Sequence, residues 1–422
     1  MQRRMVGATF LAAVTSIGTT LMTRPQEKPP HSTALRVVLA GMVHGHVDGF
    51  LAAAVKRNDI EIVGVAEPDR ALFDMYAKKY ALDAKLYHAD LEEMLNATHP
   101  GAVLVYTNTF DHRRVVETSA KYAGGTQPGA TTKQKPPAVM MEKPLAVSAE
   151  DAHAIARAAE EVRMPVLVNY VTTWAPSSRG AYNVVHTGEI GEVRKLVAHN
   201  GHKGPKEIGV GPEFLGWLTD PKLNGGGALY DFGCYGAVFM TWLMGGEPPL
   251  TVTAVTLQIK PEVYPKVDDD ATIILTYPKA QAILQASWNW PFDRTDLEVY
   301  GQTGTVVTRG RDAIEVRRAG ETEAKRVAAK PVEPPNDDPL TYLRAVAMEG
   351  MKPDGMSSLE LNVVVAEILD AARQSAKTGK TVAFRSLAKA KSSDRGATGL
   401  PSRLRAKALR GSGQDEAGRY RT

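Results

Sequence analysis

Three side chains near the middle of the chain have the chemistry to move a proton: Lys143, Asp231 and Tyr235. Asp231 and Tyr235 are four residues apart, a spacing that places two side chains on one face of a helix. The glycines at 225–227, just before them, let the backbone come close to a ligand. A phenol accepts a proton near neutral pH only when something lowers its pKa from about 10, and the ammonium of Lys143 would do so. The alternative is a lysine at a surface turn, an aspartate at a helix start and a tyrosine in the core.

The residues before Lys143 indicate where it lies in the fold. Residues 138–141 are a short apolar run, typical of a buried strand, and Glu142-Lys143-Pro144 follows directly. Ligands of open α/β folds bind at the carboxyl ends of the strands, so this position favours a functional lysine. His112 and Asn169 are further candidates for the same pocket.

A second set of residues suits a dinucleotide. Residues 36–41 form an apolar strand that ends in glycine, a helical pattern follows, and residues 60–66 form a second strand that ends at Glu67. Strand, glycine turn, helix, strand and acid is the order of a dinucleotide-binding unit. Glu67 would accept hydrogen bonds from both ribose hydroxyls and repel a 2′-phosphate. We therefore predict NAD as the cofactor, while Arg70 leaves NADP open.

The glycine turn itself departs from the usual G-x-G-x-x-G pattern. Gly41 permits the tight turn, and Gly45 lets backbone N–H groups approach a pyrophosphate at the helix N-terminus. Val43 stands where the second glycine is expected, His44 follows it, and His46 stands where the last glycine is expected. Alone this is an ordinary turn between a strand and a helix, and the acid at the end of the second strand is what favours a nucleotide site.

Helices and strands alternate up to residue 148, and strands dominate afterwards. This pattern predicts a Rossmann domain with a doubly wound parallel sheet at residues 36–148. An α+β domain with a large open, mostly antiparallel sheet is expected at residues 149–384. Residues 1–35 are interpreted as a signal segment with a linker, and residues 385–422 as a basic, disordered tail.

The first residues are typical of export. Arg3 and Arg4 precede the apolar residues 5–22, which Thr, Ser and Gly interrupt, so the stretch would make a poor permanent membrane anchor. We expect an exported, periplasmic protein with a signal of the twin-arginine type. If the segment is not a signal, the protein is cytoplasmic.

Composition excludes several classes of function. Cys234 is the one cysteine among 422 residues, which rules out an internal disulfide and a cysteine-based metal centre, and we predict no metal site. The net charge is +4, but residues 1–35 contribute +3 and residues 386–422 contribute +6, so the remaining body carries −5. Such a body is not built to bind nucleic acid.

Several motifs in order resemble the glucose–fructose oxidoreductase/inositol dehydrogenase (Gfo/Idh/MocA) family. The resemblance covers roughly Arg36 to Phe384. It rests on the turn at 41–46, the acid Glu67, and the segments 107–112, 142–144, 188–191, 225–235, 298–304 and 375–382.

The resemblance implies a nicotinamide site and a catalytic centre. The implied catalytic residues are Lys143, Asp231 and Tyr235. The implied cofactor-binding residues are Gly41, Val43, His44, Gly45, His46, Glu67, Thr107, Asn108, His112, Glu142 and Lys143. Two of them depart from the family: Asn108 stands where proline is common, and Tyr235 where most members have histidine and a minority tyrosine.

The expected activity is hydride transfer between NAD(P) and a sugar, polyol or related hydroxyl or carbonyl substrate. Tyr235 or Lys143 would take the proton, and Asp231 would orient Lys143 or the substrate. The open sheet is expected to form a homo-oligomer interface. Two alternatives stay open: an NAD-dependent glycosidase that oxidises its substrate transiently, and a non-catalytic nucleotide-binding protein.

Overall fold

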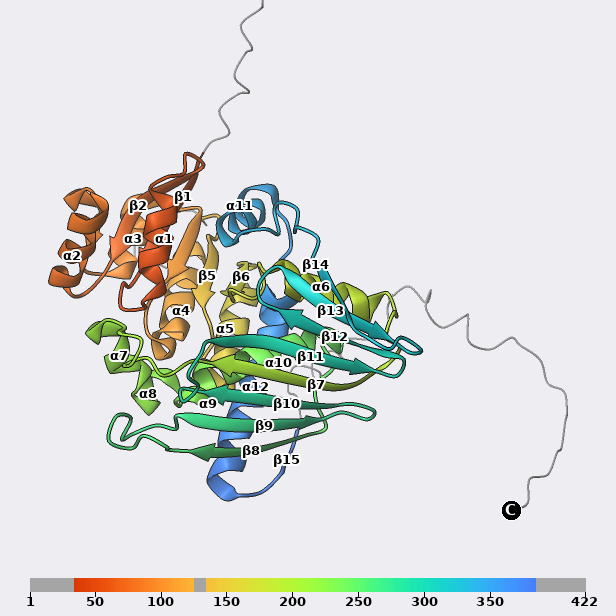
Figure 1. The fold of residues 1–422 in the computed structure, drawn as a ribbon. Helices are drawn as coiled ribbons and strands as arrows, with labels where there is room; N and C mark the ends of the chain where they lie inside the picture. The colour runs from red at the N-terminus through yellow and green to blue at the C-terminus, as the bar shows by residue number, and fades with distance from the viewer. Residues whose placement is uncertain (1–33, 125–133, 385–422) are drawn as a thin grey trace, which may run out of the picture.

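Two β-sheets organise the chain, of which the computed structural model describes residues 34–124 and 134–384. The first sheet belongs to the amino-terminal part, and the second, larger sheet lies beside it (Figure 1). The predicted export segment, apart from its last two residues, and the predicted basic tail lie outside the described residues.

The first sheet contains six parallel strands in the order β3-β2-β1-β4-β5-β6. Its central strands are buried on both faces, as their continuous apolar runs require. The strands are β1 (Leu35–Ala40), β2 (Ile60–Ala66), β3 (Tyr87–His88), β4 (Ala102–Val105), β5 (Ala138–Glu142) and β6 (Val166–Asn169).

Helices cover this sheet, and aspartates begin two of them. The side chain of Asp69 caps α2, and that of Asp90 caps α3 by accepting a hydrogen bond from the backbone N–H of Glu93. The elements are α1 (His46–Ala54), α2 (Arg70–Tyr80), η1 (Ala84–Leu86), α3 (Leu91–Thr98), η2 (Thr109–Asp111), α4 (His112–Gly124), α5 (Ala149–Val162) and α11 (Pro339–Glu349).

The first domain extends beyond the boundary predicted at residue 148. Helix α5 and strand β6 follow that residue, and β6 pairs with β5 to complete the sheet. Val166, Leu167 and Val168 are at most 2% exposed. Ending the domain at residue 148 would leave the edge of β5 unpaired, so the boundary prediction is wrong by about 20 residues.

The second sheet contains nine strands in the order β14-β13-β12-β11-β7-β10-β9-β8-β15. All neighbouring pairs are antiparallel except β7 and β10, in agreement with the predicted mostly antiparallel sheet. The strands are β7 (Val193–Gly201), β8 (Thr251–Leu257), β9 (Asp270–Thr276), β10 (Gln281–Ser287), β11 (Arg294–Gly301), β12 (Gly304–Arg309), β13 (Ala313–Arg318), β14 (Lys325–Ala328) and β15 (Val382–Ala383).

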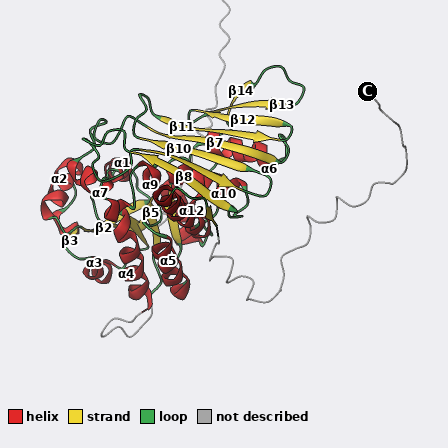
Figure 2. Ribbon diagram, turned by 90° about the horizontal axis from the view of Figure 1, so that it is seen from below, coloured by secondary structure: helices red, strands yellow, loops and turns green. Residues whose placement is uncertain are grey.

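Helices lie on one face of the second sheet, and its other face is open (Figure 2). Side chains along β9 and β10 alternate between buried and half-buried, which is typical of a sheet covered on one side. The helices of this part are α6 (Pro176–His186), α7 (Pro212–Leu218), α8 (Pro221–Asn224), α9 (Ala228–Asp231), α10 (Gly233–Leu243), η3 (Gly355–Ser357) and α12 (Leu359–Thr378). None of the helices in the described residues combines the length and the apolar character needed to cross a bilayer.

Candidate active site

The turn after β1 has the geometry of a dinucleotide turn. Gly41 has a φ of +79°, and a Cβ at this position would lie 2.7 Å from Cγ2 of Thr107. Both features require glycine, as the sequence predicts. The backbone N–H of His44 donates to the carbonyl of Tyr106, which holds the turn across the ends of β1 and β4.

Glu67 lies beside this turn, directly after β2. It is 3% exposed, and burial raises the pKa of its carboxyl group. The backbone N–H of Met42 donates to Oε2 at 2.7 Å, and that of Asp69 to Oε1 at 2.9 Å. A carboxylate has about four acceptor positions, so two stay free for ribose hydroxyls. The hydrogen bond from Met42 also fixes the carboxylate against the turn.

His44 is a neutral imidazole in the turn. Burial lowers the pKa of His44 well below its usual value, and the neighbouring His46 adds to that effect. Its Nδ1 accepts the backbone N–H of His46 at 3.2 Å, so the hydrogen of the neutral ring is on Nε2. The rings of Phe214 and Trp217 in α7 pack against it. His44 can therefore donate, but not accept, at Nε2.

A chain of hydrogen bonds joins His46 to the end of β5. His46 Nδ1 lies 2.9 Å from Oε2 of Glu142. Asn169 donates to the other carboxylate oxygen at 2.9 Å, and Trp174 donates to the Asn169 carbonyl at 2.8 Å. Burial alone would lower the pKa of His46, but the Glu142 carboxylate outweighs it and raises that pKa. His46 replaces the expected glycine with a side chain that can carry charge.

The same residues come close enough to hold a metal ion. Ligand atoms of His44, His46 and Glu142 lie within 4.8 Å of one another. Those of His199, Asp296 and Glu298, on the second sheet, do so as well. In the first group an ion would have to displace the hydrogen bonds that already occupy His44 Nδ1 and both oxygens of Glu142. We therefore assign that group to the cofactor turn.

Lys143 and Asp231 form a buried ion pair. Both side chains are 8% exposed, and Lys143 Nζ lies 2.5 Å from Asp231 Oδ1 and 2.9 Å from its backbone carbonyl. Trp288 donates to the other carboxylate oxygen at 2.9 Å. Burial would lower the pKa of Lys143, but Asp231 outweighs it and raises that pKa. For Asp231, Lys143 and Trp288 outweigh burial and lower the carboxyl pKa. The predicted orientation of Lys143 by Asp231 is thus present.

Tyr235 lies beside this pair, although not on the predicted helix face. Helix α9 ends at Asp231, Phe232 follows, and α10 starts at Gly233, so a break separates Asp231 from Tyr235. Lys143 Nζ lies 5.2 Å from the centre of the Tyr235 ring. Burial raises the pKa of Tyr235, and the ammonium offsets only part of the rise. The prediction of an acidified phenol is therefore wrong for this structure: Tyr235 is a neutral hydroxyl.

A cavity of about 390 Å³ adjoins Tyr235. The hydroxyl of Tyr235 makes no hydrogen bond with any described residue, and neither do the side chains of three other polar lining residues, Asn200, Ser177 and Ser178. These three are each 3% exposed, and apolar walls come from neighbours such as Phe239. Buried polar groups without a protein partner point to a polar ligand.

The sequence argument did not include Asn200, Ser177 or Ser178. One signal for Asn200 was present, because it is in register with the inward-facing Leu196 and Ala198 of β7. A polar residue on an otherwise apolar strand face is a candidate for a site. The serines begin α6 and carry no comparable pattern.

Three other predicted cofactor residues have different roles. His112 is 1% exposed, burial lowers its pKa to about 4, and its Nε2 has no partner among the described residues. Because Nδ1 of His112 lies against the Leu145 carbonyl, Nε2 is the acceptor of the neutral ring, and it could accept a hydrogen bond from a cofactor. Asn108 instead caps η2 through Asp111. The backbone carbonyl of Val43 accepts a hydrogen bond from Trp217.

Two further aromatic side chains contact the segment around Asp231. His202 follows β7, accepts the backbone N–H of Gly204 at 2.9 Å, and packs edge-on against Phe232. Burial lowers its pKa. Trp288 is fully buried, and its indole N–H holds the carboxylate of Asp231.

Two family descriptions match the chain. Residues 35–170 match "Oxidoreductase family, NAD-binding Rossmann fold", and residues 179–307 match "GFO/IDH/MocA C-terminal domain". The first match ends near the last strand of the first sheet, and the second contains Asp231 and Tyr235.

Curated relatives include trans-1,2-dihydrobenzene-1,2-diol dehydrogenases. Those of Macaca fascicularis and Homo sapiens are 24% identical over 242 residues, which is 57% of this chain and 64% of theirs. The Xenopus laevis protein is 30% identical over 150 residues, 35% of this chain and 42% of its own. The chain thus aligns with less than two thirds of the length of these relatives.

Solved structures share the fold. Aldose-aldose oxidoreductase from Caulobacter crescentus has a TM-score of 0.67 at 19% identity, covering 83% of this chain and 100% of its own. An inositol dehydrogenase homologue from Azotobacter vinelandii, complexed with NAD+, has a TM-score of 0.69 at 16% identity, covering 84% of this chain and 98% of its own. At these identities the likeness shows a shared fold.

Proposed function

The chain belongs to the Gfo/Idh/MocA oxidoreductase family, and we propose that it is an NAD-dependent oxidoreductase acting on a hydroxyl or carbonyl group of a sugar, polyol or related diol. One observation carries this proposal. The buried Lys143–Asp231 pair lies beside Tyr235, whose free hydroxyl adjoins a cavity with unpartnered polar walls. The cofactor turn is connected to this pair, because His46 in the turn contacts Glu142, the residue next to Lys143.

The residues of the chain can supply the proton donor and a positive charge beside the substrate oxygen, and a bound cofactor would supply the hydride acceptor. Bound NAD would accept or return a hydride. Asp231 keeps the ammonium of Lys143 charged and in place, so that Lys143 can stabilise negative charge on the substrate oxygen. The hydroxyl of Tyr235 is placed to donate a proton when a carbonyl is reduced, and to accept one in the reverse direction.

The cavity favours a substrate with several hydroxyl groups. Asn200 offers both a donor and an acceptor, and the serine hydroxyls of α6 offer more of each. The apolar wall at Phe239 suits the carbon face of a ring. The relatives act, by their names, on a cyclic diol or on aldoses, which is compatible with this lining.

A substrate screen tests the activity. Purified protein is mixed with NAD and a panel of aldoses, cyclitols and cyclic diols, and reduced nicotinamide is followed by absorbance. A dehydrogenase accumulates reduced cofactor with one class. An NAD-dependent glycosidase instead cleaves a glycoside without net reduction, and a non-catalytic protein binds NAD and does neither. Each of the last two outcomes would replace the proposal.

The position of Glu67 predicts a preference for NAD over NADP. Its carboxylate is fixed beside the turn by two backbone N–H groups, where it would repel a 2′-phosphate. We expect a dissociation constant at least tenfold lower for NAD than for NADP. In Glu67→Gln this ratio should shrink towards one. Equal affinities in the unmodified protein, measured by calorimetry, would exclude this role.

His46 predicts a pH dependence of cofactor affinity. Glu142 raises the pKa of His46 above 6.5, so the imidazolium beside the N-terminus of α1 attracts a pyrophosphate below that pKa and loses its charge above it. The other charged or titratable groups near His46 are His44, Lys143 and Asp231, and His44 and Lys143 keep their charge states near neutral pH. NAD affinity should fall as pH rises through the pKa of His46. In His46→Asn the affinity should be weaker at low pH and nearly independent of pH; an unchanged profile would contradict the assignment.

Export and oligomer formation remain proposals. Export rests on Arg3, Arg4 and the apolar residues after them, which lie outside the described residues. A homo-oligomer through the second sheet rests on its open face. Exposed apolar side chains at the end of β8 support an interface near the β8–β15 edge of this sheet: Val255 is 61% exposed and Leu257 56%.

A further inference from the structure

Lys260 uses its whole ammonium group inside the protein. It follows β8, and its side chain is 21% exposed. Its Nζ donates to the backbone carbonyl of Lys203 at 2.7 Å, to that of Trp288 at 2.8 Å and to Oε1 of Glu207 at 2.6 Å. An ammonium group has three N–H donors, so each of them has an acceptor. Within the described residues, no hydrogen bond or ion pair joins Lys260 to any of the three candidate catalytic residues.

The loop at residues 203–207 is shaped around this ammonium group. The ring of Tyr264 is fully buried, its centre lies 5.1 Å from Nζ of Lys260, and its hydroxyl donates to the second carboxylate oxygen of Glu207. Gly204 has a φ of +124°, and a Cβ at this position would overlap with Oε2 of Glu207. Lys260 and Tyr264 outweigh burial and lower the pKa of Glu207. The loop therefore closes around a charged pair.

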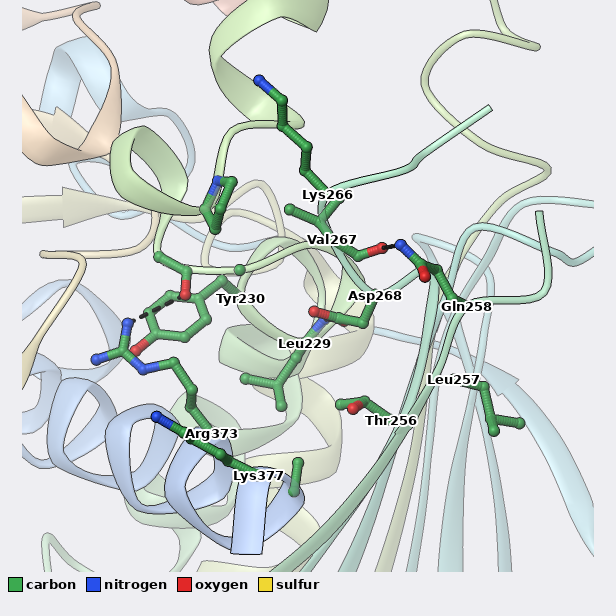
Figure 3. A pocket seen from close by; sticks show the side chains of 14 residues that line it. Leu229, Tyr230, Thr256, Leu257, Gln258, Lys266, Val267, Asp268, Arg373 and Lys377 are labelled. Atoms are coloured by element: carbon green, nitrogen blue, oxygen red, sulfur yellow. Dashed lines mark hydrogen bonds between the residues drawn. The ribbon is translucent and has the colours of Figure 1, made fainter. Parts of the chain in front are cut away.

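The segment that carries Tyr264 is tied to the strands beside it. Gln258, at the end of β8, donates to the backbone carbonyls of Tyr264 at 2.8 Å and Val267 at 3.1 Å, and Figure 3 shows the second of these bonds. Asp268, in the same view, accepts two backbone N–H groups from residues 227–229. These bonds hold both ends of the segment in which the ammonium group is anchored.

Trp288 connects Lys260 to the candidate active site. Its carbonyl accepts from Lys260, and its backbone N–H donates to the carbonyl of Asp269 at 2.8 Å. Its ring is fully buried and packs against Tyr264, with 4.9 Å between the ring centres. The indole N–H donates to Oδ2 of Asp231 at 2.9 Å. The backbone of Trp288 is thus held on both sides, and its ring ends on the carboxylate of the buried ion pair.

Asp231 stands where such support matters. Helix α9 has four residues and ends at Asp231, and the break at Phe232 separates it from α10. One carboxylate oxygen holds the ammonium of Lys143, and the other accepts the indole N–H of Trp288. The bond from Trp288 therefore orients the carboxylate from the side opposite to the group that the carboxylate has to place.

We propose that Lys260 is a positioning residue for the reaction: by holding the carbonyl of Trp288, it places the indole N–H that orients Asp231. Lys143 is placed in turn, because Asp231 holds its ammonium group. This inference rests on the proposed oxidoreductase function. Lys260 contacts neither substrate nor cofactor in this role, so its loss should slow the reaction without weakening substrate binding.

Steady-state kinetics of Lys260→Met, with the substrate found in the screen, measures the effect. Methionine keeps most of the length of the side chain and removes the charge and the donors. We expect kcat to fall by a factor of about 10–100 at an unchanged KM for the substrate, since a displacement of about 1 Å in a catalytic group can cost that much. Lys260→Arg keeps a charged donor and should recover part of the rate. The matched control is Lys279→Met, whose lysine is 68% exposed and pairs with Glu192, and it should behave like the unmodified protein.

A double variant tests whether the effect passes through Trp288. Trp288→Phe keeps an aromatic ring and removes the indole N–H, so it should lower kcat alone. In Lys260→Met/Trp288→Phe, kcat should match that of Trp288→Phe within a factor of about two, because Lys260 acts through the same N–H. Losses that multiply would overturn the proposal, as would a normal kcat in Lys260→Met. If Lys260→Met does not fold, Lys260→Arg takes its place in this comparison.

Labelling of the one cysteine tests the same connection without turnover. Cys234 is fully buried, and its Sγ donates to the backbone carbonyl of Asp231 at 3.4 Å. Its reaction with a thiol reagent under native conditions reports local opening around Asp231. In Lys260→Met, labelling should accelerate by a factor of about ten beyond the change in the unfolding equilibrium constant measured in urea.

An acceleration that only matches the loss of global stability would overturn the proposal, because it would make Lys260 a purely structural residue. Lys279→Met should show no more than that. Since labelling needs no substrate, it gives a result even if the substrate screen fails, and the two failures can be told apart.

Discussion

Replacing Tyr235 with phenylalanine should lower turnover by a factor of about 10²–10⁴, while NAD binding is retained. The change removes one oxygen from a ring that stays packed against Tyr170 and beneath Lys143. The hydroxyl has no protein partner among the described residues, so its loss should leave the fold intact. Steady-state rates with the substrate found in the screen measure the effect.

A pH profile distinguishes a chemical role for Tyr235 from a packing role. Because burial raises the pKa of Tyr235, the phenol is neutral at pH 7, and oxidation of an alcohol should accelerate as pH rises. Tyr235→Phe should lose this dependence. Tyr182→Phe is the matched control, since Tyr182 stacks on Trp242 and its hydroxyl bonds to no described residue. Near-normal turnover in Tyr235→Phe would reduce Tyr235 to a packing residue.

Breaking the Lys143–Asp231 pair should have the largest effect on stability. Asp231→Asn leaves a buried ammonium without its counter-charge, and such single changes cost about 3–5 kcal/mol of unfolding free energy. Turnover should be lost at the same time, because Lys143 is no longer held. Urea denaturation followed by circular dichroism measures the first effect.

A double variant separates the two roles of the pair. Lys143→Met/Asp231→Leu removes both charges and replaces them with apolar side chains of similar size, so most of the stability should return. Turnover should not return. If the double variant is active, the pair is structural. If Asp231→Asn is as stable as the unmodified protein, the two charges do not depend on each other.

The fold was accessible to sequence reasoning because its signals are local. The runs at β1 and β2, the glycine with positive φ at position 41 and the cap at Asp90 are each set by residues within a few positions. The error at residue 148 arose because membership of β6 in the first sheet depends on pairing with β5, which lies 24 residues earlier in the chain at the nearest ends. Periodicity carries no information about such pairing.

The sequence was sufficient to predict which residues come together in the candidate site, but not the direction of their pKa shifts. Lys143, Asp231 and Tyr235 do come together, but the break at Phe232 and the burial of the phenol reverse the expected pKa shift of Tyr235. A sequence gives neither burial nor distance. For the same reason, the contact of Trp288 with Asp231 could not be foreseen, since 57 residues separate them.

Departures from a motif also needed the structure. His46 in place of a glycine weakened the expectation of a nucleotide site when only the sequence was considered. In the structure its ring bonds to Glu142, beside Lys143, and so becomes part of the site. The loss of the glycine is offset because the His46 ring can carry a positive charge at the N-terminus of α1.

Calorimetric titration with NAD tests the central claim most directly, because it needs no substrate. We predict saturable binding of one NAD per chain, tighter below the pKa of His46 than above it, and weakened in both Glu67→Gln and His46→Asn. Quenching of tryptophan fluorescence should accompany it, since Trp217 bonds to the backbone of the turn at Val43. Failure to bind NAD or NADP at millimolar concentration, in a protein that is folded by circular dichroism, would contradict the account.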